Sequence, residues 1–170
     1  MPLSKIPNSM QAALTDAEMP SGSIINVYNS GIAIGASSNS SSFVKFITVG
    51  NYTTTMANSK LLIQVDVQTQ VGNVNQTNSL GVFNLRHSLD SYSEDLIRFA
   101  HANYRDVSGS NGWNQPTPTF SALHVPNVAA GTSIEYQIWA RASTGNGSIY
   151  VNDGWGQAST GSFIVQEIVP

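Results

Sequence analysis

Two stretches of the chain alternate between apolar and polar residues with a period of two. Leu61, Ile63, Val65 and Val67 occupy every second position, and the apolar residues of 134–142 repeat the pattern. Because successive side chains of a β-strand point to opposite faces, this period predicts strands with one face on a core and the other in water. The alternation therefore restricts the chain to folds built from sheets.

Seven further segments have the composition of strands and are bounded by Gly, Asn and Ser turns. They are residues 23–28, 42–48, 79–86, 96–104, 119–125, 148–151 and 162–169. Residues 90–95 fit either one helical turn or a loop, and the Gly- and Ser-rich segment 31–42 is predicted to be a mobile loop. Nine short strands joined by polar turns predict an all-β protein, an antiparallel β-sandwich of jelly-roll type.

The composition changes near residue 21. Before that point, apolar residues are spread among three prolines and no strand pattern is present. We therefore divide the chain into an extended N-terminal arm, residues 1–21, and one sandwich domain, residues 22–170. The apolar side chains of the arm are predicted to dock on a capsid protein or a neighbour, or else to fold back over their own domain. These side chains are Leu3, Ile6, Met10, Leu14 and Met19.

Composition excludes several classes of function. Charged residues make up only 10% of the chain, the net charge is −3, and the seven basic residues are scattered along the sequence, which argues against a nucleic-acid partner. There is no cysteine, and so no disulfide or thiolate site. No apolar run is long enough to cross a bilayer, and no signal peptide is visible, so we expect no membrane partner and assembly in the cytoplasm.

The titratable residues form no recognisable catalytic motif. His87, His101 and His124 are too far apart for a local metal motif, although folding could bring them together, and we expect single histidines on sheet faces. The acids of residues 90–95 lie in a Ser-rich connection and are expected to be solvated rather than a catalytic carboxylate pair. We predict no catalytic residue, no metal ligand and no cofactor.

Three aromatic residues, Trp113, Tyr150 and Trp155, lie in or beside Gly and Asn turns. Aromatic side chains on loops can stack on sugar rings or anchor a protein interface. The alternative is that they close the ends of the sandwich. The sequence leaves both interpretations open.

The two ends of the chain resemble a known group of proteins. The opening "SKIP…MPSGSIINVYN" resembles the start of small virion proteins of tailed bacteriophages, and "AAGTSIEYQIWARAS…GSIYVNDGWGQASTGSFIVQEIVP" resembles the end of their β-sandwich head domains. Such domains are similar to the jelly rolls of the complement and tumour-necrosis-factor superfamily, which usually trimerise. The resemblance implies a jelly-roll fold and a location on the virion, and it implies no catalytic residues.

The short arm leaves no room for the shaft of a tail fibre. We therefore expect a non-enzymatic virion structural protein, a homotrimeric capsid decoration protein that binds the major capsid protein or another virion protein and stabilises the assembled phage head. The alternative is a receptor- or glycan-binding head domain of a tail fibre or other virion appendage, with a host surface glycan as its ligand. A third hypothesis is a carbohydrate-active enzyme built on residues 90–95.

Overall fold

The fold is that of a computed structural model. The structure describes residues 19–32, 35–72, 78–104, 119–142, 148–151, 153–154, 157–158 and 161–170. Within these ranges, no helix has the length and apolar character needed to cross a membrane.

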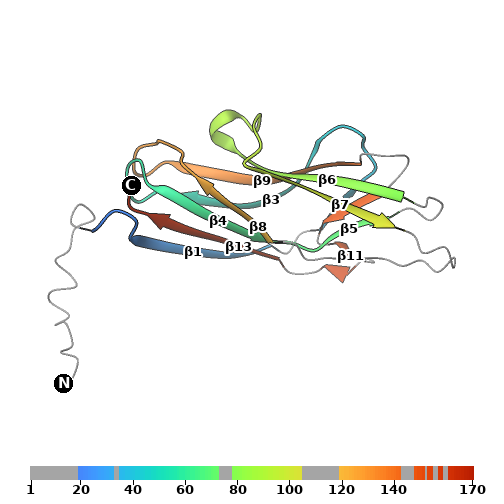
Figure 1. The fold of residues 1–170 in the computed structure, drawn as a ribbon, viewed down its shortest axis with the longest axis horizontal. Helices are drawn as coiled ribbons and strands as arrows, with labels where there is room; N and C mark the ends of the chain where they lie inside the picture. Colours follow the sequence, from blue (N-terminus) through green and yellow to red (C-terminus); the bar gives the residue numbers. More distant parts are fainter. Residues whose placement is uncertain are drawn as a thin grey trace, which may run out of the picture.

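Eight long strands form two antiparallel four-stranded sheets. Sheet I contains, in spatial order, β1 (Ile24–Ile32), β13 (Gly161–Ile168), β4 (Lys60–Asp66) and β8 (Thr119–His124). Sheet II contains, in spatial order, β3 (Val44–Thr53), β9 (Ser133–Ala142), β6 (Asn78–His87) and β7 (Ile97–Tyr104). In Figure 1, β9 and β6 run along the upper side of the molecule, and β1 and β13 run along the lower side.

The strand pairs define the topology. Along the chain, the first long strand pairs with the last (β1 with β13), and the second pairs with the seventh (β3 with β9). The third pairs with the sixth (β4 with β8), and the fourth pairs with the fifth (β6 with β7). This is one long antiparallel hairpin rolled into two sheets, the arrangement of a jelly roll. The predicted all-β jelly-roll sandwich is confirmed.

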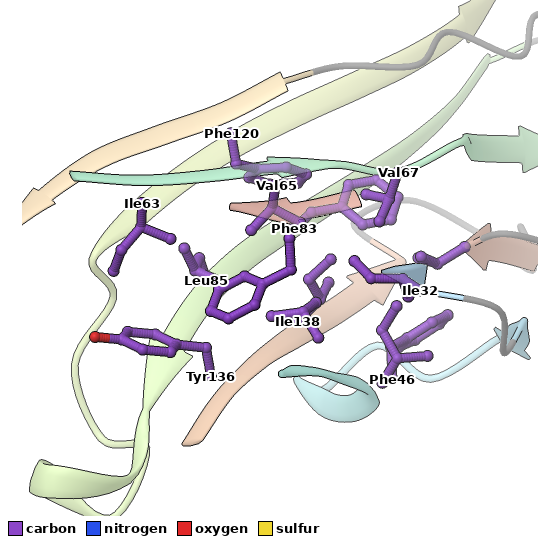
Figure 2. Packing of buried hydrophobic residues seen from close by; sticks show 14 of the residues in the cluster. Ile32, Phe46, Ile63, Val65, Val67, Phe83, Leu85, Phe120, Tyr136 and Ile138 are labelled. Carbon is purple, nitrogen blue, oxygen red and sulfur yellow. The ribbon is translucent and has the colours of Figure 1, made fainter. Parts of the chain in front are cut away.

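The alternating side chains fill the space between the sheets. Ile63 and Val65 of β4, and Tyr136 and Ile138 of β9, are fully buried. Figure 2 shows them converging with Phe83 and other apolar side chains between the strands. Because every second residue points inward, the inner face of each strand follows directly from its sequence.

All nine predicted strand segments coincide with strands, and some shorter elements were not predicted. A three-stranded sheet has the order β2 (Ala36–Ser38), β10 (Ser148–Val151) and β5 (Thr69–Gly72). A small hairpin joins β11 (Asp153–Gly154) to β12 (Gln157–Ala158).

Two connecting segments differ from, or refine, what the sequence predicts. Within the predicted loop 31–42, residues 31–32 form the end of β1 and residues 36–38 pair with β10, so these parts of the segment are strand. The ambiguous connection after β6 begins with a 3-10 turn, η2 (Ser88–Asp90), and continues through Ser91 and Tyr92 in the left-handed backbone region.

Candidate interaction surfaces

Part of the outer face of sheet I, mainly on its two edge strands, exposes apolar side chains where a solvated sheet face is usually polar. The register aligns Val27 of β1 with Gln166, Gln166 with Leu62, and Leu62 with Leu123 of β8. Residues directly opposite each other on paired strands share a face. Because Leu61 and Phe163 point inward, this row points outward.

Four of the five exposed large apolar side chains among the described residues belong to this side of the molecule. Ile24 is 50% exposed, Val27 58%, Leu123 59% and Val125 45%. We call this surface the apolar face and define it by Ile24, Val27, Leu62, Leu123 and Val125. Contiguous apolar surface on a soluble protein marks an interaction site more often than chance exposure does.

The chain enters the sandwich beside the apolar face. The Gly22 amide donates to the Val169 carbonyl at 3.1 Å, and the Val169 amide donates to the Ser23 carbonyl at 2.9 Å. These bonds pin the segment before β1 against the end of β13 in sheet I. Of the predicted arm contacts, Met19 is described and is half-buried in a bend, whereas Leu3, Ile6, Met10 and Leu14 lie outside the described residues.

One of the three predicted ligand-facing aromatic residues is described. Tyr150 is half-buried in β10, where it lies opposite Ser37 and Gln70, so it belongs to a central strand rather than a turn. Trp113 and Trp155 lie outside the described residues.

The outer face of sheet II gathers arginines around one aromatic ring. The guanidinium carbons of Arg86 and Arg141 each lie 5.1 Å from the centroid of the Phe43 ring, and that of Arg98 lies 5.6 Å from it. Lys45 of β3 lies directly opposite Trp139 of β9, on the same face of the sheet. We call this surface the arginine face and define it by Phe43, Lys45, Arg86, Arg98, Trp139 and Arg141. The basic residues that appear scattered in the sequence are therefore partly collected by the fold, because four of the seven lie here.

Asp95 ties two of these arginines together. Its Oδ1 accepts hydrogen bonds from Arg86 Nε and Asn84 Nδ2, both at 2.7 Å, and its Oδ2 lies 2.5 Å from a terminal nitrogen of Arg98. The predicted solvated acid is instead a half-buried ion-pair partner. Because Arg86 stacks between Phe43 and Trp139, at 5.1 Å from each ring centroid, its side chain is held in one place.

Polar side chains along β9 form a row on the same face. The Trp139 indole donates to Gln137 Oε1 at 2.9 Å, the Gln137 amide donates to Glu135, and the Tyr92 hydroxyl donates to Glu135 at 2.6 Å. The hydrogen bond from Tyr92 is the main reason that the pKa of Glu135 is lowered. Burial and the neighbouring Glu135 raise the pKa of Tyr92 to about 12. Glu135 is thus a charged acceptor already committed to its neighbours.

Among the residues that the structure describes, one carboxylate lies in the interior: that of Glu167 in β13, which is fully buried. It accepts hydrogen bonds from the hydroxyls of Tyr52, Thr55 and Ser59, each at 2.6 Å, and from the amides of Thr55 and Met56 at 3.0 Å. Burial by itself raises the pKa of Glu167, but the hydrogen bonds from Ser59, Thr55, Tyr52 and Met56 outweigh it and lower the pKa to about 2. Because five donors already hold this carboxylate in place, we assign it to the fold.

Two histidines meet inside the sandwich. The rings of His87 and His124 are stacked with their centroids 4.3 Å apart, His124 Nδ1 lies 2.9 Å from the Tyr136 hydroxyl, and His87 Nδ1 lies 3.6 Å from Asp90. Burial, and then the neighbouring His87, lower the pKa of His124 to about 4. The expectation of single histidines on sheet faces is wrong for this pair, because both end their strands on the inner face.

The remaining titratable groups do not assemble a reaction centre in the described part of the chain. There, no three His, Cys, Asp or Glu side chains are placed to share a metal ion. The Asp90 carboxylate accepts hydrogen bonds from the backbone amides of Tyr92 at 2.9 Å and Glu94 at 2.8 Å, which stabilises its own turn. The side chain of His101 is outside what the structure describes.

No family model matches the sequence, and no curated protein matches it. Among solved structures, the chain is similar to the VP2 subviral particle of infectious bursal disease virus, with 16% identity and a TM-score of 0.37 over 87% of this chain and 39% of that one. It is also similar to the structure of the Gx strain of infectious bursal disease virus, with 18% identity and a TM-score of 0.39 over 85% of this chain and 37% of that one. For the structure of the Gt strain the identity is 16% and the TM-score 0.38, over 87% of this chain and 38% of that one. The chain therefore spans about two fifths of the length of these viral chains.

Proposed function

We propose that the protein is a non-enzymatic structural component of a virion and, more finely, a capsid decoration protein that stabilises an assembled phage head. The observation that carries the proposal is the apolar face of sheet I, which is exposed across both edge strands and adjoins the entry of the arm. Eight-stranded jelly rolls are frequent in viral capsid proteins, although the same fold also serves lectins and cupins. The resemblance of both chain ends to phage virion proteins favours the first of these.

The attachment has two parts in this proposal. Residues 1–21 form the arm, residues 22–170 form the domain, and the partner is the major capsid protein or another virion protein. An arm with several apolar anchors covers a wide surface with few residues, although ordering it costs entropy. A homotrimer multiplies the weak contacts of each copy through effective concentration. Binding only to the assembled lattice shifts the equilibrium towards assembly by mass action.

The apolar face supplies a useful but modest free energy per copy. Ile24, Val27, Leu123 and Val125 are each about half exposed, so covering them yields about 1 kcal/mol each, or about 4 kcal/mol together. That is about a thousandfold in affinity for one copy. Such a contact is weak alone and strong when three copies act together.

The test uses intact heads of the parent virus that lack this protein. We expect the purified full-length protein to cosediment with them and Leu123→Asp to bind about a hundredfold more weakly or worse, because docking then buries a carboxylate without a partner. Leu89→Asp is the matched control, since Leu89 is 40% exposed on η2, away from sheet I. Deleting residues 1–19 is expected to leave a folded domain that binds heads poorly.

Two results would overturn the proposal. One is equal binding of Leu123→Asp, the arm deletion and the intact protein to heads. The other is binding to host cells or a glycan array with no binding to heads, which would favour the receptor-binding head domain instead. Thermal unfolding of each variant separates loss of binding from loss of fold.

A further inference from the structure

We infer that the arginine face of sheet II is a second binding surface, one that takes an acidic protein segment by its carboxylates. Arg141 and Arg98, on the Phe43 ring, are the groups that would hold those carboxylates. This inference stands apart from the proposed function, because it uses the opposite sheet.

The arginine face has an excess of positive charge on a chain whose net charge is negative. Four cationic side chains lie on it, and the carboxylates hydrogen-bonded within it are those of Asp95 and Glu135. Counting the described residues, the face therefore carries two more positive than negative charges, while the whole chain carries −3. Asp90, on the adjoining turn, lies 3.6 Å from His87 Nδ1 and accepts hydrogen bonds from the amides of its own turn. The local field therefore favours an anionic partner.

Arg141 is the least satisfied cation on this surface. In the described part of the chain, its guanidinium contacts the Phe43 ring but forms no ion pair, and its Nε is buried without a hydrogen-bond partner. A buried donor that stays unpaired costs free energy, so a carboxylate that reaches it gains both a charge contact and a hydrogen bond. Arg98 has its side chain 56% exposed, which leaves donors open to solvent beside the same ring.

The surroundings of these two residues favour a protein over a sugar or a nucleic acid. Three guanidinium groups already lie around Phe43, so its ring is not free to stack on a saccharide. An excess of two charges is small for a phosphate backbone. Arg together with Trp, Tyr and Phe is the composition of protein interface hot spots. Because Arg86 and Trp139 are held by stacking and hydrogen bonds, little side-chain entropy is lost on binding.

The experiment titrates the full-length protein with three probes of equal length: a hexaglutamate peptide, a hexaglutamine peptide and a hexagalacturonate. Binding is followed by amide chemical shifts at low and at high salt. We expect the glutamate peptide to bind and the glutamine peptide not to bind. Binding of the glutamate peptide is expected to be strongly weakened at 0.5 M salt, because salt screens the attraction between exposed charges. We expect Arg141→Gln to weaken binding by about tenfold and Arg141→Lys by less, since lysine keeps the charge but loses the planar fork.

Lys60→Gln, on the outer row of sheet I, removes a positive charge elsewhere and is expected to change binding less than twofold. If Arg141→Gln does not fold, Arg98→Gln replaces it, because that side chain is more exposed. The inference is overturned if Arg141→Gln binds the glutamate peptide as tightly as the intact protein, or if no probe binds. Preference for the galacturonate would overturn it in favour of an acidic saccharide.

Discussion

Replacing Glu167 by glutamine tests how much the buried carboxylate contributes to the fold. Oε1 accepts the Met56 amide and the Ser59 hydroxyl, Oε2 accepts the hydroxyls of Tyr52 and Thr55, and the Thr55 amide lies 3.0 Å from both oxygens. A glutamine amide group is least disruptive at the Oε2 position, because hydroxyls can rotate to accept a proton and a backbone amide cannot.

The expected magnitude can be reached by two routes. In Glu167→Gln the two hydroxyls at the Oε2 position change from donors to acceptors, and the hydrogen bonds to Oε1 are made to a neutral oxygen. We estimate that these changes lower the stability by about 2–4 kcal/mol. The pKa route compares an unfolded value of 4.5 with a folded value of about 2 for Glu167. This difference corresponds to about 3 kcal/mol of stability at neutral pH. Both routes give about 3 kcal/mol.

The pH dependence has a fixed sign. Because the folded pKa of Glu167 is below the unfolded pKa, its contribution is fully present above pH 4.5 and is lost as the pH falls towards 2. Urea denaturation of the intact protein and Glu167→Gln is expected to differ by about 3 kcal/mol at pH 7 and by only about 1 kcal/mol at pH 3. Other titrating groups are common to both proteins and cancel in this difference.

Glu94→Gln is the matched control, because Glu94 is exposed, and it is expected to change stability by less than about 0.5 kcal/mol. Equal stability of Glu167→Gln and the intact protein at pH 7 would refute the reasoning. So would a difference that stays constant from pH 7 to pH 3, since the carboxylate charge would then have no part in it.

Two further predictions concern the interior. The pKa of His124 is about 4 in the folded protein and 6.5 in the unfolded chain, so the stability is expected to fall as the pH drops from 6.5 to 4. Measured by urea denaturation, this fall is expected to be about 3 kcal/mol larger for the intact protein than for His124→Gln. Parallel pH profiles of the two proteins would contradict this. A Cβ added at Gly50 would overlap the Phe163 ring, so Gly50→Ala is expected to lower the stability by about 1–3 kcal/mol. At Gly31 an added Cβ has no atom within 4 Å, so Gly31→Ala is expected to lower the stability much less in the same assay. Equal costs at the two glycines would show that the Phe163 ring moves aside.

The strands and the core could be predicted because alternation is a local property. The parity that places Leu61 and Ile63 inward needs no knowledge of neighbouring strands, and the same parity marks Glu167 beside Phe163 and Val165 as an inward-pointing acid. That signal was present in the sequence, as was Leu62, an apolar residue on the polar side of its strand. Of the third sheet, β10 was predicted as residues 148–151, whereas β2 and β5 were not, because strands of three or four residues carry little pattern.

The arginine face could not be predicted, because it depends on pairing between distant segments. Phe43, Arg86 and Arg141 come from different parts of the chain, and only the register of sheet II brings them around one ring. The meeting of His87 and His124 depends in the same way on how the two sheets pack. A single sequence specifies which face a residue occupies far better than which strand lies beside it.

The position of β13 between β1 and β4 constrains how the protein is made. During translation β1 leaves the ribosome first among the long strands, yet its only partner in sheet I is the last of them. At about 5–20 residues per second, the interval between the two is roughly 7–27 seconds. Throughout it the inward side chains of β1, Tyr28 and Ile32 among them, have no strand of sheet I to join, and the donors around Glu167 have no acceptor. We therefore expect β1 to stay unpaired in the nascent chain until β13 is released, and a product truncated before Gly161 to be a substrate for proteolysis rather than a partly active protein.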